Sequence, residues 1–498
     1  MAVERRWGAL ARGRTGRAAV AALVLCGVMA ACGGDGDDEA RTRAEPTAGS
    51  WTPWILSSGG EIAVPAPPAK GSNKAEADLD EVKRLAEDRS PADMDMINRF
   101  SGPTPTDPWM DRLHEYIAKS EKNPPLASRN AGLVSVAMYD AAIAAYHWKY
   151  RYDIDPPSGV DRAVSISADP SYPSEHAAMA GAASRVLAYL YPNEGSLRLD
   201  EMADQAADSR VQAGANTRSD VEAGLELGRA VAEKVIAYGK ADGSDKVWDG
   251  RRPAGIGVGG RFWAPPPGSV ANPVEPLAGT WKTFTLSRPD QFRPPPPPAY
   301  NSPEYRASAQ KLIDMKNNLT PEQAAIAKYW EGAQGSHLPA GIVNDTYIKD
   351  IREKVTSGDA AQRWTVPRVA RAVALLNIVM SDGGISVWEA KYHYWYPRPV
   401  NGIRDPGIDR NWTPHLPTPL FPAYPSGSAG YAGGAEAVMS YLIPEKAELF
   451  RQRAEEQALS RQYAGIHWDF DSVSIEGGRG IGGLVVERAR QDGADRPS

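Results

Sequence analysis

The last quarter of the chain contains cationic side chains, a tight turn and a histidine with a nearby carboxylate, a set that suits oxyanion chemistry. The residues are Lys391, Arg398, the turn Pro425-Ser426-Gly427-Ser428, Arg461, His467 and Asp471. Lysine and arginine neutralise an oxyanion, and the backbone N–H groups at a helix entry donate hydrogen bonds to it. A histidine can attack or ligate its central atom. Together these segments predict a site for a tetrahedral oxyanion.

The spacing of these residues supports this interpretation. Seven residues are nearly two helical turns, so Lys391 and Arg398 can face the same way, although Pro397 is expected to end the helix between them. Asp471 lies four residues beyond His467, which lets its carboxylate hold one imidazole nitrogen and orient the other. Taken singly, each cation suits a solvated surface, the histidine suits a core or surface position, and the Ser-Gly turn suits an ordinary helix cap. Their combination favours the oxyanion site.

An internal repeat indicates that this site belongs to one of two related halves. Three segments of the first half match three of the second in the same order. The pairs are 138–150 with 380–392, 172–192 with 424–444, and 209–220 with 460–471. The middle pair aligns without gaps and is identical at 11 of 21 positions. Such ordered matches predict a duplicated helical bundle.

Helical periodicity dominates both halves and strand signals are nearly absent. We therefore predict an all-α fold of two related helical bundles packed together, with a Pro-rich extended connector between them. Among the expected helices are residues 303–317, 366–394 and 428–442, and helical patterning also covers 195–240. The predicted parts are a signal peptide 1–32, a flexible tether 33–73, an N-terminal bundle 74–245, the connector 246–302 and a C-terminal bundle 303–492.

The first 32 residues resemble an export signal. A basic front precedes an apolar run, and Met-Ala-Ala-Cys resembles a bacterial lipobox, in which cleavage leaves a lipid-modified Cys32. We expect an exported protein that is either anchored to the cell surface by this lipid or secreted, with Sec and twin-arginine export both open. Membrane contact is expected only through the lipid anchor. Cleavage would also remove Cys26, so no disulfide framework would remain.

At the oxyanion residues the chain resembles the superfamily of vanadium-dependent haloperoxidases and type 2 phosphatidic acid phosphatases. The signature of that superfamily runs K-x6-RP, then PSGH, then SR-x5-H-x3-D, and all three blocks occur here in order. One position departs from it, because Ser428 replaces the histidine of PSGH. Trp388 and the segment from Phe421 to Gly427 look like the soluble bacterial haloperoxidases rather than the membrane phosphatases. The resemblance covers roughly residues 100 to 490.

The resemblance implies vanadate as the cofactor and assigns roles by position. His467 would be the axial metal ligand, with Asp471 orienting its ring. The vanadate oxygens would be held by Lys391, Arg398, Ser426, the Gly427 amide and Arg461. Glu331 is a weaker candidate partner for Arg461. Trp388 and Phe421 are similar to residues that flank the halide side of the pocket.

The implied activity is that of a haloperoxidase, which oxidises bromide or chloride with hydrogen peroxide to a hypohalous species. That species would halogenate a small organic substrate, and a homodimer is left open. The metal would keep its oxidation state while Lys391 polarises the oxygen that the halide attacks. No basic excess is present at a net charge of −6, so nucleic acid is not an expected partner.

A phosphoester hydrolase with His467 as nucleophile is the alternative for the same site. Ser428, a candidate catalytic position, weighs against it, because serine is not a general acid near neutral pH. His393 and His415 are the nearby histidines in sequence that could replace the missing one. A phosphate-binding or cell-surface interaction protein is a third interpretation, and the complete cation set with His467 argues against it.

The N-terminal copy of the motif is degenerate. It retains Lys149, Pro173-Ser174, His176 and Ser209-Arg210. Glu175 replaces the turn glycine, Asn216 stands where His467 does, and Pro156-Pro157 replaces the Arg-Pro pair. Without the histidine and one arginine, we expect this copy to bind no vanadate and to serve as a packing scaffold.

Overall fold

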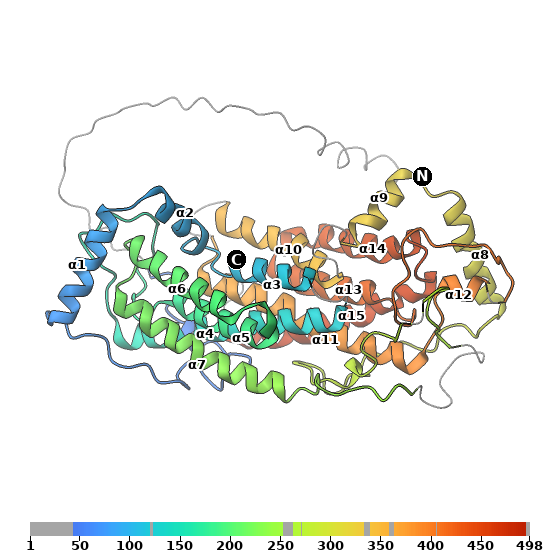
Figure 1. Ribbon diagram of the computed structural model, residues 1–498, viewed down its shortest axis with the longest axis horizontal. Helices are drawn as coiled ribbons and strands as arrows, with labels where there is room; N and C mark the ends of the chain where they lie inside the picture. The colour runs from blue at the N-terminus through green and yellow to red at the C-terminus, as the bar shows by residue number, and fades with distance from the viewer. Residues whose placement is uncertain are drawn as a thin grey trace, which may run out of the picture. The chain divides into compact units, whose positions relative to one another are not determined.

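The computed structural model describes residues 43–119, 123–251, 262–269, 271–332, 339–357, 363–404 and 406–494. All regular secondary structure within these ranges is helical, as predicted, and no strand occurs in them (Figure 1). The predicted signal peptide, including Cys26 and Cys32, and residues 33–42 of the predicted tether lie outside the described residues.

The helices occur in two series that repeat in the same order. The first series is α1 (Asn73–Glu87), α2 (Pro91–Phe100), α3 (Asp107–Lys119), α4 (Pro124–Tyr152), α5 (Glu175–Leu190), α6 (Ser196–Gln212) and α7 (Arg218–Lys240). The second series is α8 (Pro303–Asn317), α9 (Pro321–Tyr329), α10 (Pro339–Thr356), α11 (Val366–Tyr394), α13 (Gly427–Leu442), α14 (Ala447–Tyr463) and α15 (Ser474–Arg490). A short helix, α12 (Pro399–Arg404), has no counterpart in the first series and was not predicted.

The sequence determines many of these boundaries through local capping. The side chains of Ser90, Thr217 and Thr320 each accept a hydrogen bond from a backbone N–H of the first turn. The side chain of the residue three positions later in turn accepts one from the backbone N–H of the cap. The patterning over 195–240 forms two helices, α6 and α7, because Gly214 adopts a positive φ of 72° and Thr217 caps a new helix. Gly465 has a φ of 70° at the equivalent turn of the second series.

Helices α4 and α11 pack against each other at the centre of the fold (Figure 1). Both have 29 residues and are buried along most of their length. The stretch Val366–Arg404 is long and apolar enough to span a membrane by length and composition, and its most apolar window is entirely buried within the protein. The shared α4–α11 contact joins the two series into one core.

Residues 43–72 form an ordered strap on the first series, so the prediction of a flexible tether is wrong for this part of the chain. Trp51 is 1% exposed. The backbone N–H groups of residues 54, 55 and 56 donate to the buried carboxylate of Asp140 at 2.8, 2.8 and 3.0 Å. Composition alone was misleading because this Gly- and Pro-rich chain obtains its hydrogen bonds from a buried side chain rather than from a helix or sheet.

The connector forms the equivalent strap on the second series. The backbone N–H groups of Phe284 and Thr285 donate to the buried carboxylate of Asp382 at 2.8 and 2.7 Å. Farther along, carbonyls of the proline run accept hydrogen bonds from Tyr394, Tyr396 and Tyr424 at 2.7, 2.7 and 2.5 Å. Proline lacks an N–H but keeps its carbonyl, so the run can still bind the helical body.

Close contact between α13 and α15 depends on glycine, which gives a stability prediction. A Cβ on Gly478 would lie 2.1 Å from the Gly430 carbonyl oxygen, whereas a Cβ on Gly483 of the same helix would meet no atom within 4 Å. Gly478→Ala should therefore lower the free energy of unfolding by about 1–3 kcal/mol. Gly483→Ala should leave it unchanged or raise it by up to about 1 kcal/mol. Thermal and urea unfolding of the two variants beside the wild type measures the difference; equal stability of both would contradict this packing.

Candidate oxyanion site

Lys391 is fixed at the end of α11 by a cage of carbonyl groups. Its Nζ donates to the carbonyl oxygens of Pro422, Ala423 and Pro425 at 2.9, 2.8 and 2.6 Å, and its side chain is fully buried. The helix ends at Tyr394, and Trp395 follows in the left-handed region with a φ of 50°. The ammonium group therefore ties the end of α11 to the loop that leads into α13.

Arg398 lies just beyond this helix end and reaches the histidine segment. Its Nε donates to the Phe421 carbonyl at 2.8 Å, and its Nη1 donates to the Ile466 carbonyl at 2.7 Å. The same Nη1 lies 3.0 Å from His467 Nε2. Arg398 Nη2 is buried without a hydrogen-bond partner among the described residues. A buried donor of this kind is costly, and an anion would satisfy it.

Asp471 orients His467 in the structure. Asp471 Oδ2 lies 2.6 Å from His467 Nδ1 and also accepts the Trp468 backbone N–H at 3.1 Å. A carboxylate accepts hydrogen bonds and an arginine donates them, so the contacts assign the ring proton to Nδ1 and leave the lone pair on Nε2. This nitrogen faces Arg398, where a ligand of the site would be held.

The turn before α13 lies beside this pair. Ser426 caps α13 through its Oγ, and its backbone N–H donates to the Asp471 carbonyl at 2.8 Å. Ser474 Oγ donates to the Ser426 carbonyl at 2.6 Å. A Cβ on Gly427 would lie 3.4 Å from the Trp388 ring and 3.9 Å from Lys391 Cε, so glycine keeps the space between the turn and the lysine open. Ser428, the next residue of α13, is buried.

Arg461 joins the site from the last turn of α14. Its Nη2 donates to the Ala327 carbonyl at 2.5 Å and its Nε to Ser460 Oγ at 2.9 Å, which holds α14 against α9. Glu331, at the end of α9, is the carboxylate whose charge acts on this guanidinium. The predicted Glu331 thus acts on Arg461 through its charge, while the hydrogen bonds of Arg461 go to Ala327 and Ser460.

The buried cationic groups of the site lack enough negative charge to balance them. Burial lowers the pKa of Arg398 to about 9, against the opposing charge of Asp471. Burial likewise lowers the pKa of Arg461 to about 10, and burial together with the positive charge of Arg398 holds the pKa values of Lys391 and His467 well below their usual range. Burial raises the pKa of Asp471 to about 7, against the pull of the cations. The buried cations repel one another, and a bound anion would relieve that repulsion.

Aromatic rings cover one side of the cations. The Trp388 and Phe421 rings lie 4.8 Å apart between centroids. Lys391 Nζ is 5.7 Å from the Trp388 centroid and 5.2 Å from that of Phe421, and Arg398 Cζ is 4.8 Å from that of Phe421. These two predicted halide-side residues therefore form an apolar wall at the cation cluster.

Neither proposed replacement for the missing histidine is placed in this cluster. His393 is exposed on α11, where burial and the charge of Arg293 lower its pKa. His415 is exposed in the loop before α13. Sequence reasoning did not identify Ser474 or the carbonyls that hold Lys391 and Arg398. The two prolines of residues 422–425 are the sequence signal that indicates an extended loop, whose carbonyls have no helical partners.

Comparisons with known proteins point to the same region. A family model described as the VCPO second helical-bundle domain matches residues 371–449, which include Lys391, Arg398 and the turn. The chain is 30% identical over 144 residues to the vanadium chloroperoxidase of Curvularia inaequalis, a stretch that is 25% of this chain and 23% of that protein. It is 24% identical over 216 residues to a non-specific acid phosphatase of Salmonella typhimurium, which is 40% of this chain and 72% of the phosphatase.

Solved structures share the fold. A bacterial vanadium-dependent iodoperoxidase superposes with a TM-score of 0.61 at 24% identity, covering 78% of this chain and 96% of the other. An apo-type bacterial vanadium-dependent chloroperoxidase superposes with a TM-score of 0.55 at 16% identity, covering 74% and 94%. At these identities the likeness establishes the architecture alone. Residues 371–449, with the lysine, the arginine and the turn, therefore match the VCPO second helical-bundle domain, within a fold that the chain shares with bacterial vanadium-dependent peroxidases.

Proposed function

We propose that the protein is a vanadium-dependent haloperoxidase that uses hydrogen peroxide to oxidise a halide, which then halogenates a small organic substrate. The observation that carries this proposal is the buried positive cluster around His467 Nε2, whose lone pair faces Arg398. Vanadate is a tetrahedral oxyanion that also accepts a nitrogen ligand. The cluster and the lone pair match these two requirements.

The residues present fit vanadate. Arg398 Nη2 is a buried donor with no hydrogen-bond partner in the described structure, and Gly427 leaves space at the positive end of α13. His467 would supply the nitrogen ligand. The residues that would hold the oxygens are Lys391, Arg398, Ser426, the Gly427 amide and Arg461.

The chain contributes electrostatics and positioning to the reaction. The chemistry that vanadate supplies when bound is the activation of hydrogen peroxide toward a halide without a change in metal oxidation state. Lys391 and Arg398 withdraw electron density from the oxygen that the halide attacks, and burial strengthens their effect. The carbonyl contacts fix both cations before substrate arrives, and Lys391, whose three Nζ donors already serve carbonyls, must release one of them to contact a bound oxygen. The Trp388 and Phe421 rings make that side of the cluster apolar.

Phosphoester hydrolysis is the second candidate, favoured by the similarity to the acid phosphatase. Such a reaction needs a general acid for the leaving alcohol, and the position of Ser428 is where the superfamily signature places a histidine. The first series has His176 at the equivalent position, where it contacts the Gly102 carbonyl at 3.2 Å. A histidine is therefore compatible with this fold, and serine at 428 favours the peroxidase.

A paired assay on one protein preparation separates the two activities. Halogenation of an activated arene is measured with hydrogen peroxide and chloride, bromide or iodide, with and without orthovanadate; hydrolysis of p-nitrophenyl phosphate is measured in parallel. We expect halogenation that requires vanadate and is competed by phosphate, with hydrolysis near the buffer rate. Strong hydrolysis that vanadate inhibits, with no halogenation, would instead establish the hydrolase.

A further inference from the structure

The degenerate site of the first series keeps the architecture of the oxyanion site. Lys149, 3% exposed, donates to the carbonyls of Pro170 and Ser171, as Lys391 donates to Pro422 and Ala423 in the second series. The Ser174 backbone N–H donates to the Asp220 carbonyl at 2.9 Å, as that of Ser426 donates to Asp471. The lysine cage and the turn are therefore built in both copies.

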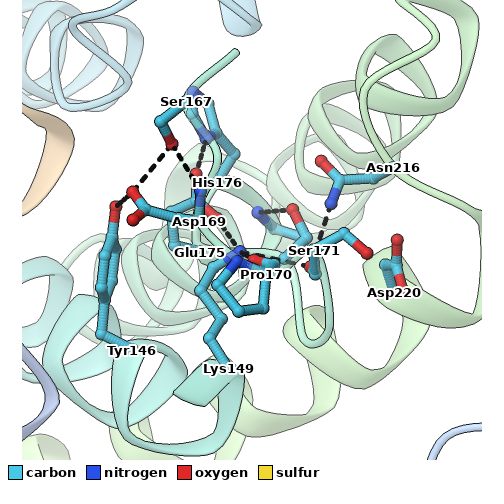
Figure 2. Close-up of polar contacts among 12 residues, drawn as sticks. Tyr146, Lys149, Ser167, Asp169, Pro170, Ser171, Glu175, His176, Asn216 and Asp220 are labelled. Atoms are coloured by element: carbon cyan, nitrogen blue, oxygen red, sulfur yellow. Dashed lines mark hydrogen bonds and ion pairs between the residues drawn. The ribbon is translucent and has the colours of Figure 1, made fainter. Parts of the chain in front are cut away.

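Glu175 occupies the place that Gly427 leaves open. Its Oε2 lies 2.9 Å from Lys149 Nζ, and its Oε1 lies 2.9 Å from His176 Nδ1 (Figure 2). All three side chains are buried. A Cβ on Gly427 would lie 3.9 Å from Lys391 Cε, with the Trp388 ring nearer at 3.4 Å, so a longer side chain at this position of the turn can reach the lysine.

The other polar residues of the first-series site, Arg210 and Asn216, hydrogen-bond to each other and to the backbone. Arg210, the counterpart of Arg461, donates through Nε to Asn216 Oδ1 at 3.0 Å. Asn216, at the position of His467, donates to the Ser171 carbonyl at 3.1 Å. Burial opposes ionisation of Glu175, but the charge of Lys149, the hydrogen bond with His176 and the charge of Arg210 hold the pKa of its carboxyl well below the usual range. Glu175 is thus a buried anion in a cationic cradle.

We propose that the Glu175 carboxylate takes the place of the bound oxyanion in the first series, so that this copy is a tetrahedral-oxyanion site closed by its own side chain. The carboxylate compensates the lysine charge that an external anion would otherwise compensate. It also fills the space in front of the turn. Removal of this side chain therefore leaves a site for an anion of the phosphate class, in a part of the chain separate from the proposed catalytic site.

The test uses Glu175→Gly in the full-length protein with inorganic phosphate as the probe. Equilibrium dialysis counts phosphate bound per chain, and thermal unfolding reports stability. We expect the variant to bind one phosphate more than the wild type does. Without phosphate its Tm should be several degrees below that of the wild type, because Lys149 is left uncompensated, and saturating phosphate should restore most of the loss.

Glu175→Gln supplies the matched control. The amide fills the same space without the charge, so this variant should lose stability, bind no additional phosphate and gain no more Tm from phosphate than the wild type. Equal phosphate counts in Glu175→Gly and wild type would overturn the proposal, as would a Tm gain in Glu175→Gly no larger than in Glu175→Gln. If Glu175→Gly cannot be isolated folded, wild-type stability of Glu175→Gln would overturn it. Because every result is a difference from wild type, it stands apart from the function proposed for the second series.

Discussion

Replacement of His467 by alanine is expected to abolish vanadate-dependent halogenation while the protein stays folded. Removing a group that only supports a metal ligand typically costs 10–100-fold in metal affinity or activity, so removing the ligand itself should cost more than about 100-fold. The measurement is the halogenation rate as a function of orthovanadate concentration, with circular dichroism to verify the helical fold.

His393→Ala is the control for this variant. His393 is exposed on α11, on the chain segment that carries Lys391, and its pKa responds to Arg293 and the acidic residues near it rather than to the oxyanion cluster. The halogenation rate of His393→Ala should stay within about twofold of the wild-type rate, as expected for a surface substitution. If His467→Ala retained wild-type halogenation at saturating vanadate, the assignment of His467 as the ligand would be wrong.

Replacement of Arg398 by lysine is expected to produce the next largest loss, although the charge is conserved. The planar guanidinium donates hydrogen bonds to the Phe421 and Ile466 carbonyls and contacts His467 Nε2. Its Nη2 has no hydrogen-bond partner among the described residues. One ammonium group cannot occupy all these positions. Loss of a preorganised donor costs about 10²–10³-fold in rate, and we expect kcat/KM for the halide to fall in that range with weaker vanadate binding.

Arg293→Lys provides the comparison, because Arg293 pairs with Glu389 through its guanidinium at a partly exposed position. The Arg293→Lys variant should keep kcat/KM within about twofold of the wild-type value, since surface ion pairs contribute little to stability. An equal effect of the two arginine variants would show that general charge, rather than the geometry at Arg398, supports the activity.

Helix positions were predictable where local signals were strong. The bounds of α8 and α11 agree with the expected residues 303–317 and 366–394, because proline stands in the first turn of each and apolar periodicity continues to the end. The strap at residues 43–72 was missed because its stability comes from Asp140 on α4, which lies far away in sequence. A sequence signal for this strap was present, since Ala48–Trp51 differs from Ala278–Trp281 of the connector at one position.

The site residues were predictable as a set, but not the contacts between them. Spacing alone suggested the pairing of His467 with Asp471, which the structure shows at 2.6 Å. Helical spacing does not account for the proximity of Lys391 and Arg398, because α11 ends between them. The chain beyond the helix turns back toward the cluster. The carbonyls that hold both cations come from distant loops, whose positions depend on the packing of α11, α13 and α14 rather than on local pattern.

The two copies of the turn clarify what glycine contributes. Both copies place a capping serine after a Tyr-Pro pair and aim the next residue at a buried lysine. Where that residue is Glu175, the cation has an internal partner; where it is Gly427, the partner must come from outside. Among the differences between the copies, the change from glutamate to glycine is the one that closes or opens the space in front of the lysine.

A titration of vanadate-free protein with orthovanadate tests whether the second series holds a vanadate-dependent catalytic site. Halogenation rate and vanadium bound per chain are measured on the same samples in the presence of hydrogen peroxide and halide. We predict that both rise together and saturate at one vanadate per chain, since Glu175 closes the first copy. A rate that does not depend on bound vanadium, or one vanadate bound per chain without halogenation by any halide tested, would rule out a vanadium-dependent haloperoxidase.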